Sequence, residues 1–267
     1  CAGGDVKGMS SRNSEGRGDM TIDKAIHQQR DHQRGTSGKL FKMPKPTIAS
    51  LPGAAAGAGL SYALSCDLRI MSSAAFMTTA FAKVGFSGDY GGTYFMSQLI
   101  GSAKARELYF LSDRVSAEEA LSLGLTDWVV EPDELENKTK EIAEQLAAGP
   151  SVAYRYMKEN LNRAMSGDVD DCLDLEATHH VHCGETLDHK NAVKAFIEKK
   201  SLAAQIARGS DNLSEVVGRA FDSNSQLDAF KDLSRTVKRS KNPEAFAGLR
   251  HGVFDELTKR ATVKNGE

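Results

Sequence analysis

Short apolar runs alternate with helical segments through the first half of this chain, and helical patterns alone follow. The sequence predicts strands in four apolar runs bounded by turn residues, at 47–51, 67–71, 74–79 and 126–130. Helical spacing of apolar residues then fills most of 151–200. This order predicts an α/β fold class, with a helical appendage after the α/β core.

Start and stop signals mark the ends of several helices. Ser116 with Glu119 three residues later forms a capping box, and Gly124 ends the helix that it opens. Gly149 and Pro150 close the next helix. Further helices are expected at 22–34, 91–101 and 102–113.

The charge balance excludes several classes of partner. The 267 residues include 34 basic and 36 acidic ones, so no bulk field points to nucleic acid or an anionic membrane. Charges interrupt every apolar stretch well before the roughly 18 residues of a membrane span.

The four cysteines stand apart, which favours free thiols and a cytoplasmic location. The chain opens on Cys1 without a Met or a leader pattern, so we expect a fragment or a processed piece.

Two glycine-containing loops are candidates for binding a negatively charged oxygen. The backbone of 2–5 (AGGD) can approach a ligand closely, and the N–H groups of 55–59 (AAGAG) lie at an expected helix N-terminus. One N–H from each loop can converge on one oxygen as an oxyanion hole. Taken alone, 2–5 is more often a surface turn and 55–59 more often close helix–strand packing. A dinucleotide site is a poor alternative, because no G-x-G-x-x-G with a later acid follows a strand.

Asp89 is the candidate acid–base group. It lies among small residues in 85–93 (GFSGDYGGT), just before an expected helix. Burial in such a place raises the pKa of an aspartate toward the working range of a base. The competing interpretation, equally weighted from the pattern, is a helix N-cap, because Asp is a favoured capping residue.

Four segments in a fixed order resemble the enoyl-CoA hydratase/isomerase (crotonase) family. They are CAGGDVKG, KPTIASLPGAAAGAGLSYALSCDLRI, FAKVGFSGDYGGTYFMSQLIGSAKARELYFLSDRVSAEEALSLGLTDWVV and DHKNAVKAFIEKK. The resemblance covers residues 1–200 and implies a crotonase-like ββα superhelix, with its core at 1–148 and its first strands missing. It also implies a helical region for trimer assembly at 149–200. The remaining 201–267 is expected to be an extra helical segment of unknown role.

The resemblance implies roles for single residues. The family's oxyanion hole falls on the N–H groups of Gly4 and Ala58. Ala2 and Lys7 fall in the segment that contacts coenzyme A in the family. Tyr90, beside Asp89, is expected either to donate to the substrate or simply to pack.

Two more positions concern assembly. Phe196 and Lys199 resemble residues that reach the coenzyme A of a neighbouring subunit. The family's members lead us to expect a homotrimer or a dimer of trimers, an expectation by analogy. The substrate is expected to be an acyl-CoA thioester, with no metal or redox cofactor, no nucleic acid partner and no membrane partner.

The catalytic acids of the family's hydratases are missing. Their positions fall on Ser61 and Phe81, whereas Asp89 matches the single aspartate of several family isomerases and of aromatic-thioester dehalogenases. One carboxylate suits moving a proton between two carbons, so isomerisation is favoured over hydration. Two alternatives stay open: hydrolase or dehalogenase chemistry by Asp89, and a catalytically inactive homologue or interaction module.

A histidine-rich cluster is the candidate for metal binding. His179, His180, His182 and Cys183 have spacings that can place ligands on one helix face. A solvated or interface face is the favoured interpretation.

Overall fold

The computed structural model describes residues 1, 3–4 and 21–207, with side chains to residue 197. The predictions for Ala2 and Lys7, for the Lys199 side chain and for 208–267 lie outside this part. The chain divides into two compact units, Cys1–Cys183 and Gly184–Glu267.

Helices dominate the described chain, as the sequence predicts. The first unit contains α2 (Ile22–Gly35), α3 (Ser37–Lys42), α4 (Ala58–Leu64), the 3-10 helix η1 (Ala82–Val84), α5 (Gly92–Leu111), α6 (Ala117–Leu123), α7 (Leu135–Ala147) and α8 (Ser151–Ala164). Two more helices are α9 (Val169–Gly184) and, in the second unit, α10 (Leu187–Ala207). In the part of the chain that the structure describes, no helix has both the length and the apolar character needed to cross a membrane.

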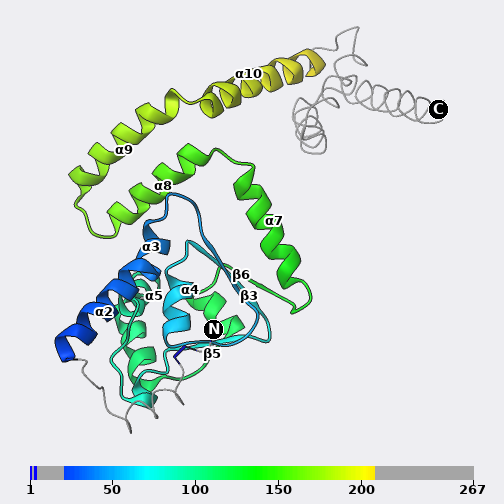
Figure 1. Cartoon of the computed structure of the whole chain (residues 1–267). Coiled ribbons are helices and arrows are strands. Elements are labelled where there is room, and N and C mark those ends of the chain that lie inside the picture. The colour runs from blue at the N-terminus through cyan, green and yellow to red at the C-terminus, as the bar shows by residue number, and fades with distance from the viewer. Residues whose placement is uncertain (2, 5–20, 208–267) are drawn as a thin grey trace, which may run out of the picture. The chain divides into compact units, whose positions relative to one another are not determined.

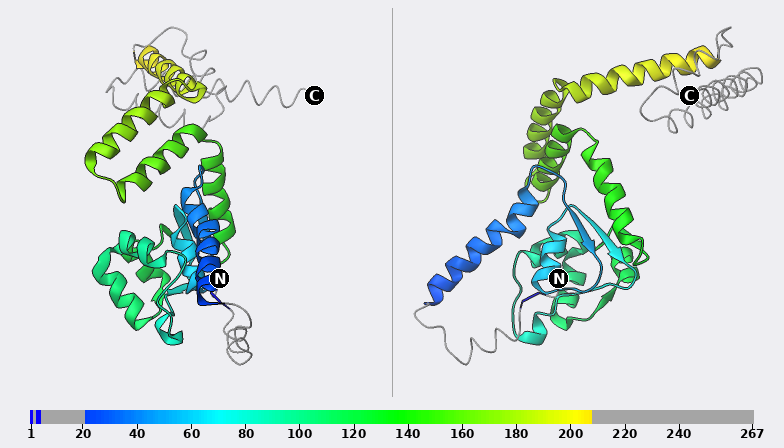
Figure 2. Two further views of the ribbon diagram at one scale, coloured as in Figure 1. Left: turned by 60° about the vertical axis from the view of Figure 1, so that its left-hand side comes forward. Right: turned by 45° about the vertical axis from the view of Figure 1, so that its right-hand side comes forward.

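Three parallel strands form the central sheet. They are β1 (Ile48–Leu51), β3 (Leu68–Ser72) and β6 (Trp128–Val130), in the order β1–β3–β6. Helix α7 covers one face of this sheet, and α4 packs on the other with α5 behind it (Figures 1 and 2). Successive residues of β3 show the division: Ile70 packs with the α7 residues Leu135 and Ile142, whereas Met71 belongs to the α4–α5 core.

A second, smaller sheet supports the turn before α4. It pairs β2 (Ala55–Ala56) with β4 (Phe76–Thr78) in parallel, and β4 with β5 (Val115–Ser116) in antiparallel fashion. The ladder continues past β2, because the Gly57 N–H donates to the Thr78 carbonyl at 3.1 Å. The glycine turn therefore has a fixed position against β4.

The helix signals in the sequence are confirmed where they are most specific. The Ser116 side chain accepts a hydrogen bond from the Glu119 N–H, and Gly124 ends α6 in the left-handed conformation. The two helices expected at 91–101 and 102–113 are the two halves of α5, which bends at Gly101 (φ 78°, ψ 159°).

A buried lysine ties α8 to the α/β core. Lys158 is 5% exposed, and its Nζ donates to the Asp67 carboxylate at 2.7 Å and to the Leu40 carbonyl at 3.0 Å. The same carboxylate oxygen accepts from the Thr47 N–H at 2.7 Å. Pairing with the half-buried Asp67 and hydrogen bonding offset the cost of burying the Lys158 ammonium group.

Candidate active site

Cys1, Gly3 and Gly4 lie beside the turn that precedes α4. The Ala56 N–H donates to the Cys1 carbonyl at 3.0 Å. A Cβ at Gly3, whose φ is 87°, would lie 2.8 Å from the Ala56 carbonyl oxygen and 3.6 Å from the Ala58 nitrogen. Glycine alone tolerates this approach, and it brings the two predicted glycine loops side by side.

The two loops open onto a cavity of about 430 Å³. Gly4, Ala58 and Asp89 all line this cavity, together with residues from α2, α4 and 80–90. Among the described residues, no acceptor engages the N–H of Gly4 or of Ala58. With Tyr90, the structure therefore brings four of the predicted site residues to one space.

The loop that carries Asp89 has an unusual backbone. Gly85, Gly88 and Gly91 have positive φ angles, and so does Tyr90 at 50°. A tyrosine rarely adopts this conformation, so the loop stores strain next to Asp89. The Oε1 atom of Gln33, on α2, accepts a hydrogen bond from the Tyr90 N–H at 2.8 Å and helps to hold the loop.

Asp89 does not cap the following helix, so the N-cap interpretation is wrong. The N-cap of α5 is Gly91, and no side chain caps that helix. The Oδ1 atom of Asp89 is buried and has no hydrogen-bond partner within the described chain. Burial raises the pKa of Asp89 above its ordinary value of 3.8. A perturbed carboxyl group in a cavity is a candidate for acid–base chemistry.

Tyr109 and Ser61 place two hydroxyl groups beside Gly92, at the start of α5. A Cβ at Gly92 would collide with both the Ser61 Oγ and the Tyr109 Oη. Burial and the charge of Asp89 raise the pKa of Tyr109, whereas a hydrogen bond with Ser61 lowers it. Tyr109 therefore keeps its proton near Asp89. Sequence reasoning missed it, because a tyrosine within a helical pattern carries no signal of its neighbours.

Ser61 and Phe81 stand where the resemblance places the two carboxylates of hydratases. Ser61 is buried and donates to the Gly57 carbonyl at 3.3 Å. Phe81 is buried and lines the cavity. Among the described residues that line the cavity, Asp89 is the one acid.

Tyr90 lines the cavity and packs against a second tyrosine that also lines it. Its ring lies 4.7 Å from that of Tyr62, between centroids. Burial, the hydrogen bond with Tyr62 and the charge of Asp89 together raise the pKa of Tyr90 to about 12, against a hydrogen bond with Gln29 that lowers it. Tyr90 packs and also keeps a protonated hydroxyl, so both expectations for it stay open.

Phe196 lies on α10, in the second unit, where its side chain is 58% exposed. The role that the resemblance gives to Phe196 and Lys199 stays a prediction.

The histidine cluster differs from its expected solvated face at one residue. His179 is buried, with its Nδ1 2.5 Å from the Asn160 Oδ1 and its Nε2 3.3 Å from the Glu159 Oε2. His179 is therefore not on a solvated face, and the interface alternative for the cluster stays a prediction. No group of three or more metal-binding side chains is found within the described residues.

Comparison with known proteins assigns the chain to a family. The family model described as enoyl-CoA hydratase/isomerase matches residues 1–205. The short-chain-enoyl-CoA hydratase of Clostridium acetobutylicum is 40% identical over 164 residues, which cover 61% of this chain and 63% of the relative. The 1,2-epoxyphenylacetyl-CoA isomerase of Escherichia coli is 35% identical over 163 residues, which cover 61% of this chain and 62% of the relative. The chain thus spans less than two thirds of the length of these two relatives.

A solved structure agrees with the same assignment. The crystal structure of an enoyl-CoA hydratase from Polaromonas sp. JS666 superposes with a TM-score of 0.68 at 29% identity. The match covers 74% of this chain and 74% of that one.

Proposed function

Because the chain belongs to the enoyl-CoA hydratase/isomerase family and has its crotonase-like fold, we propose that it shifts a double bond within an acyl-CoA thioester. Asp89 is the single acid–base group of this reaction. The observation that carries the proposal is that Asp89 is the one acid among the described residues of the cavity. Its Oδ1 atom is buried with no hydrogen-bond partner in that part of the chain.

The first step is removal of a proton from the acyl chain. Asp89 acts as the base, and its raised pKa brings it closer to that of the proton it must take. The thioester carbonyl oxygen accepts hydrogen bonds from the N–H groups of Gly4 and Ala58. These donors stabilise the enolate, and each contributes about 3–4 kcal/mol to lowering the barrier.

The second step returns the proton to a different carbon. The protonated Asp89 is the donor, and the double bond moves as the enolate collapses. One carboxylate serves both steps, which fits the replacement of the two hydratase carboxylates by Ser61 and Phe81. The reaction needs no metal or redox cofactor, because it consists of proton transfers alone.

The remaining roles follow the resemblance. Coenzyme A lies along residues 1–7, with Ala2 and Lys7 as contacts. The chain assembles as a trimer or a dimer of trimers, and Phe196 and Lys199 reach a neighbouring coenzyme A. Support for assembly comes from exposed apolar side chains on α8 and α9, such as Leu161 (69%) and Val181 (66%).

Product analysis with a panel of acyl-CoA thioesters tests the proposal. An isomeric thioester is the expected product from a β,γ-unsaturated substrate. Release of free coenzyme A would instead indicate hydrolysis, and loss of halide from an aromatic thioester would indicate dehalogenation. Absence of turnover, with no thermal stabilisation by saturating acyl-CoA, would leave the chain as an inactive homologue.

A further inference from the structure

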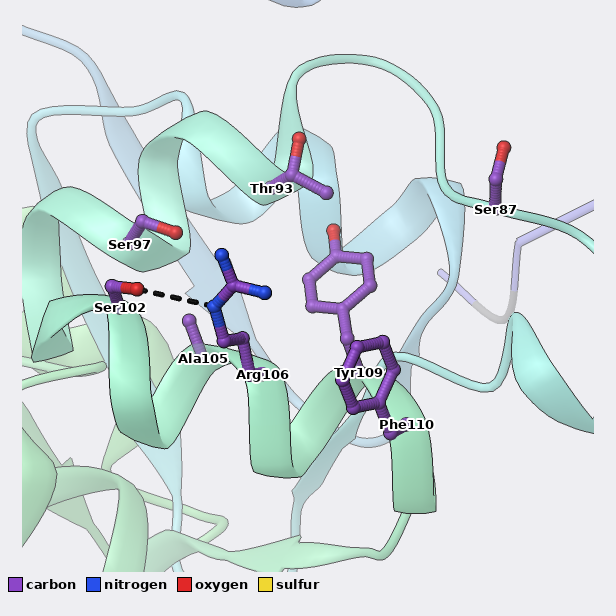
Figure 3. A pocket seen from close by; sticks show the side chains of 8 residues that line it. All are labelled: Ser87, Thr93, Ser97, Ser102, Ala105, Arg106, Tyr109 and Phe110. Carbon is purple, nitrogen blue, oxygen red and sulfur yellow. Dashed lines mark hydrogen bonds between the residues drawn. The ribbon is translucent and has the colours of Figure 1, made fainter.

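A second pocket, of about 270 Å³, adjoins the Asp89 loop and α5 (Figure 3). Its lining is rich in hydroxyl groups and includes one cation, Arg106, among the described residues. The hydroxyl-bearing side chains are Ser87, Thr93, Ser97, Ser102 and Tyr109. No acid lines the pocket in the described chain, so its lining favours an anionic group.

The bend in α5 assembles this lining. Gly101 separates Ser97, on the first half of α5, from Ser102 and Arg106, on the second half. Figure 3 shows both serines reaching toward the Arg106 guanidinium, with Tyr109 standing beside it. Two helical halves thus converge on one charged group.

Most N–H donors of Arg106 have no acceptor among the described residues. Its Nε donates to the Ser102 Oγ at 3.3 Å. No described carboxylate forms an ion pair with it, and the adjacent Glu107 is paired with Lys104 at 2.7 Å. A guanidinium carries five N–H donors, and its planar fork matches the two oxygens of a carboxylate.

The pocket and the Asp89 cavity lie on either side of the Asp89 loop, and no described residue lines both. Ser87 lines the pocket, whereas Phe86 and Asp89, from the same loop, line the cavity. Tyr109 also lines the pocket, and a Cβ at Gly88 would lie only 3.1 Å from its Cε1 atom. An acyl group held against Asp89 therefore has this pocket as its neighbour.

We infer that the pocket binds a carboxylate at the far end of the acyl group, so that the chain acts on coenzyme A mono-thioesters of dicarboxylic acids. This inference rests on the proposed function, because the acyl group reaches the pocket only from a thioester bound beside Asp89. Arg106 pairs with the terminal carboxylate, and the surrounding hydroxyl groups donate to the same oxygens. Arg106 and most of these hydroxyl side chains are exposed, so a methyl end would leave them hydrated and would gain no pairing with the guanidinium.

Binding of saturated thioesters tests the inference apart from turnover, since these compounds cannot be isomerised. Calorimetry with the full chain compares two acyl-CoA thioesters of equal length, one ending in a carboxylate and one in a methyl group, over a short series of lengths. The variants are Arg106→Gln, Arg106→Lys and, as a control outside the pocket, Lys104→Gln.

The expected result is a preference of the wild type for the carboxylate end of about two- to fivefold, as for an ion pair with an exposed side chain. Arg106→Gln should lose this preference, Arg106→Lys should keep part of it, and Lys104→Gln should keep all of it. Equal binding of the two thioesters by the wild type, or a preference that survives in Arg106→Gln, would overturn the inference. Neither result bears on the isomerase proposal, because product analysis tests isomerisation separately.

Discussion

The ring of Phe81 stacks on the ring of Tyr109, with centroids 5.8 Å apart and planes 13° from parallel. This aromatic pair fills the place where the resemblance locates a hydratase carboxylate. It gives Asp89 a poorly solvated neighbourhood, in agreement with a pKa that is raised by burial.

Asp89→Asn should lower turnover of a β,γ-unsaturated thioester by about 100- to 10,000-fold, the usual contribution of a positioned base. The affinity for coenzyme A should stay unchanged, because Asp89 lies at the acyl end of the proposed site. Steady-state kinetics and calorimetry with coenzyme A measure the two effects. Asp113→Asn, on the exposed segment after α5, is the matched control, and equal activities of the two variants would remove Asp89 from the mechanism.

The acid side of the pH profile should report Asp89. The base works only when ionised, so kcat/KM should rise with pH through the pKa of Asp89 and level off above it. Since burial raises that pKa, the rise should lie above the ordinary value of 3.8. A profile measured with a substrate below its KM gives the midpoint. A midpoint at or below 3.8 would contradict the raised pKa.

The contribution of Asp89 to folding stability should fall as pH rises, whereas its contribution to kcat/KM rises with pH. A carboxyl group whose pKa is higher in the folded chain than in the unfolded chain favours folding at low pH, and this contribution is lost as pH rises through the folded pKa. Asp89→Asn removes the penalty of a buried charge, so it should raise the melting temperature at neutral pH. The gain should shrink below the ordinary pKa of aspartate. Melting curves across this range check the prediction, and an equal gain at every pH would refute it.

Gly3→Ala should damage catalysis more than folding. The new Cβ would press on the Ala56 carbonyl and move the Gly4 N–H away from Ala58. Loss of one oxyanion donor lowers kcat by about 100-fold or more. Gly124→Ala, at the end of α6, is the matched control, because Gly124 also has a positive φ but open space around its Cβ position. Similar losses of kcat in both variants would indicate general strain and no oxyanion role.

Lys158→Met should destabilise the chain by about 1.5–3 kcal/mol, the contribution of hydrogen bonds to a charged group, because the remaining Asp67 carboxylate is 29% exposed and keeps its bonds from Thr47. The residue is 5% exposed, and its removal leaves the Asp67 carboxylate and the Leu40 carbonyl without their ammonium partner. Chemical denaturation measures the change. Lys140→Met, which breaks a surface pair with Glu144, should change stability by less than about 1 kcal/mol. Adding Asp67→Asn to Lys158→Met should recover part of the loss.

The sequence predicted the fold correctly where it carries apolar runs bounded by turn residues or specific helix-end signals. The apolar runs predicted β1, β3 and β6, and the Ser116 capping box with Gly124 predicted both ends of α6. The strands β2 and β5 were missed because two residues carry no alternation. The short α3 and η1 were missed for a related reason, since a turn or two of helix shows no apolar period.

The sequence predicted the residues of the candidate site that lie in its motifs, and it did not predict the others. Gly4, Ala58 and Asp89 lie in segments whose composition and order identify them. Tyr109 and Arg106 lie in an ordinary helical pattern, and their place beside the Asp89 loop depends on the bend at Gly101. The buried state of His179 depends likewise on contacts between α8 and α9, which spacing along one helix does not encode.

Helix α2 forms part of the cavity yet contains no buried side chain. Two amide side chains join it to the site: Gln33 accepts from the Tyr90 N–H, and Gln29 lines the cavity. The hydrophobic core is therefore largely separate from this wall, whereas Gln29 and Gln33 tie it to the Asp89 loop. Evolution, or a protein engineer, can reshape the cavity for a bulkier or slimmer acyl group by changing other positions of α2 while the folding energy stays nearly constant.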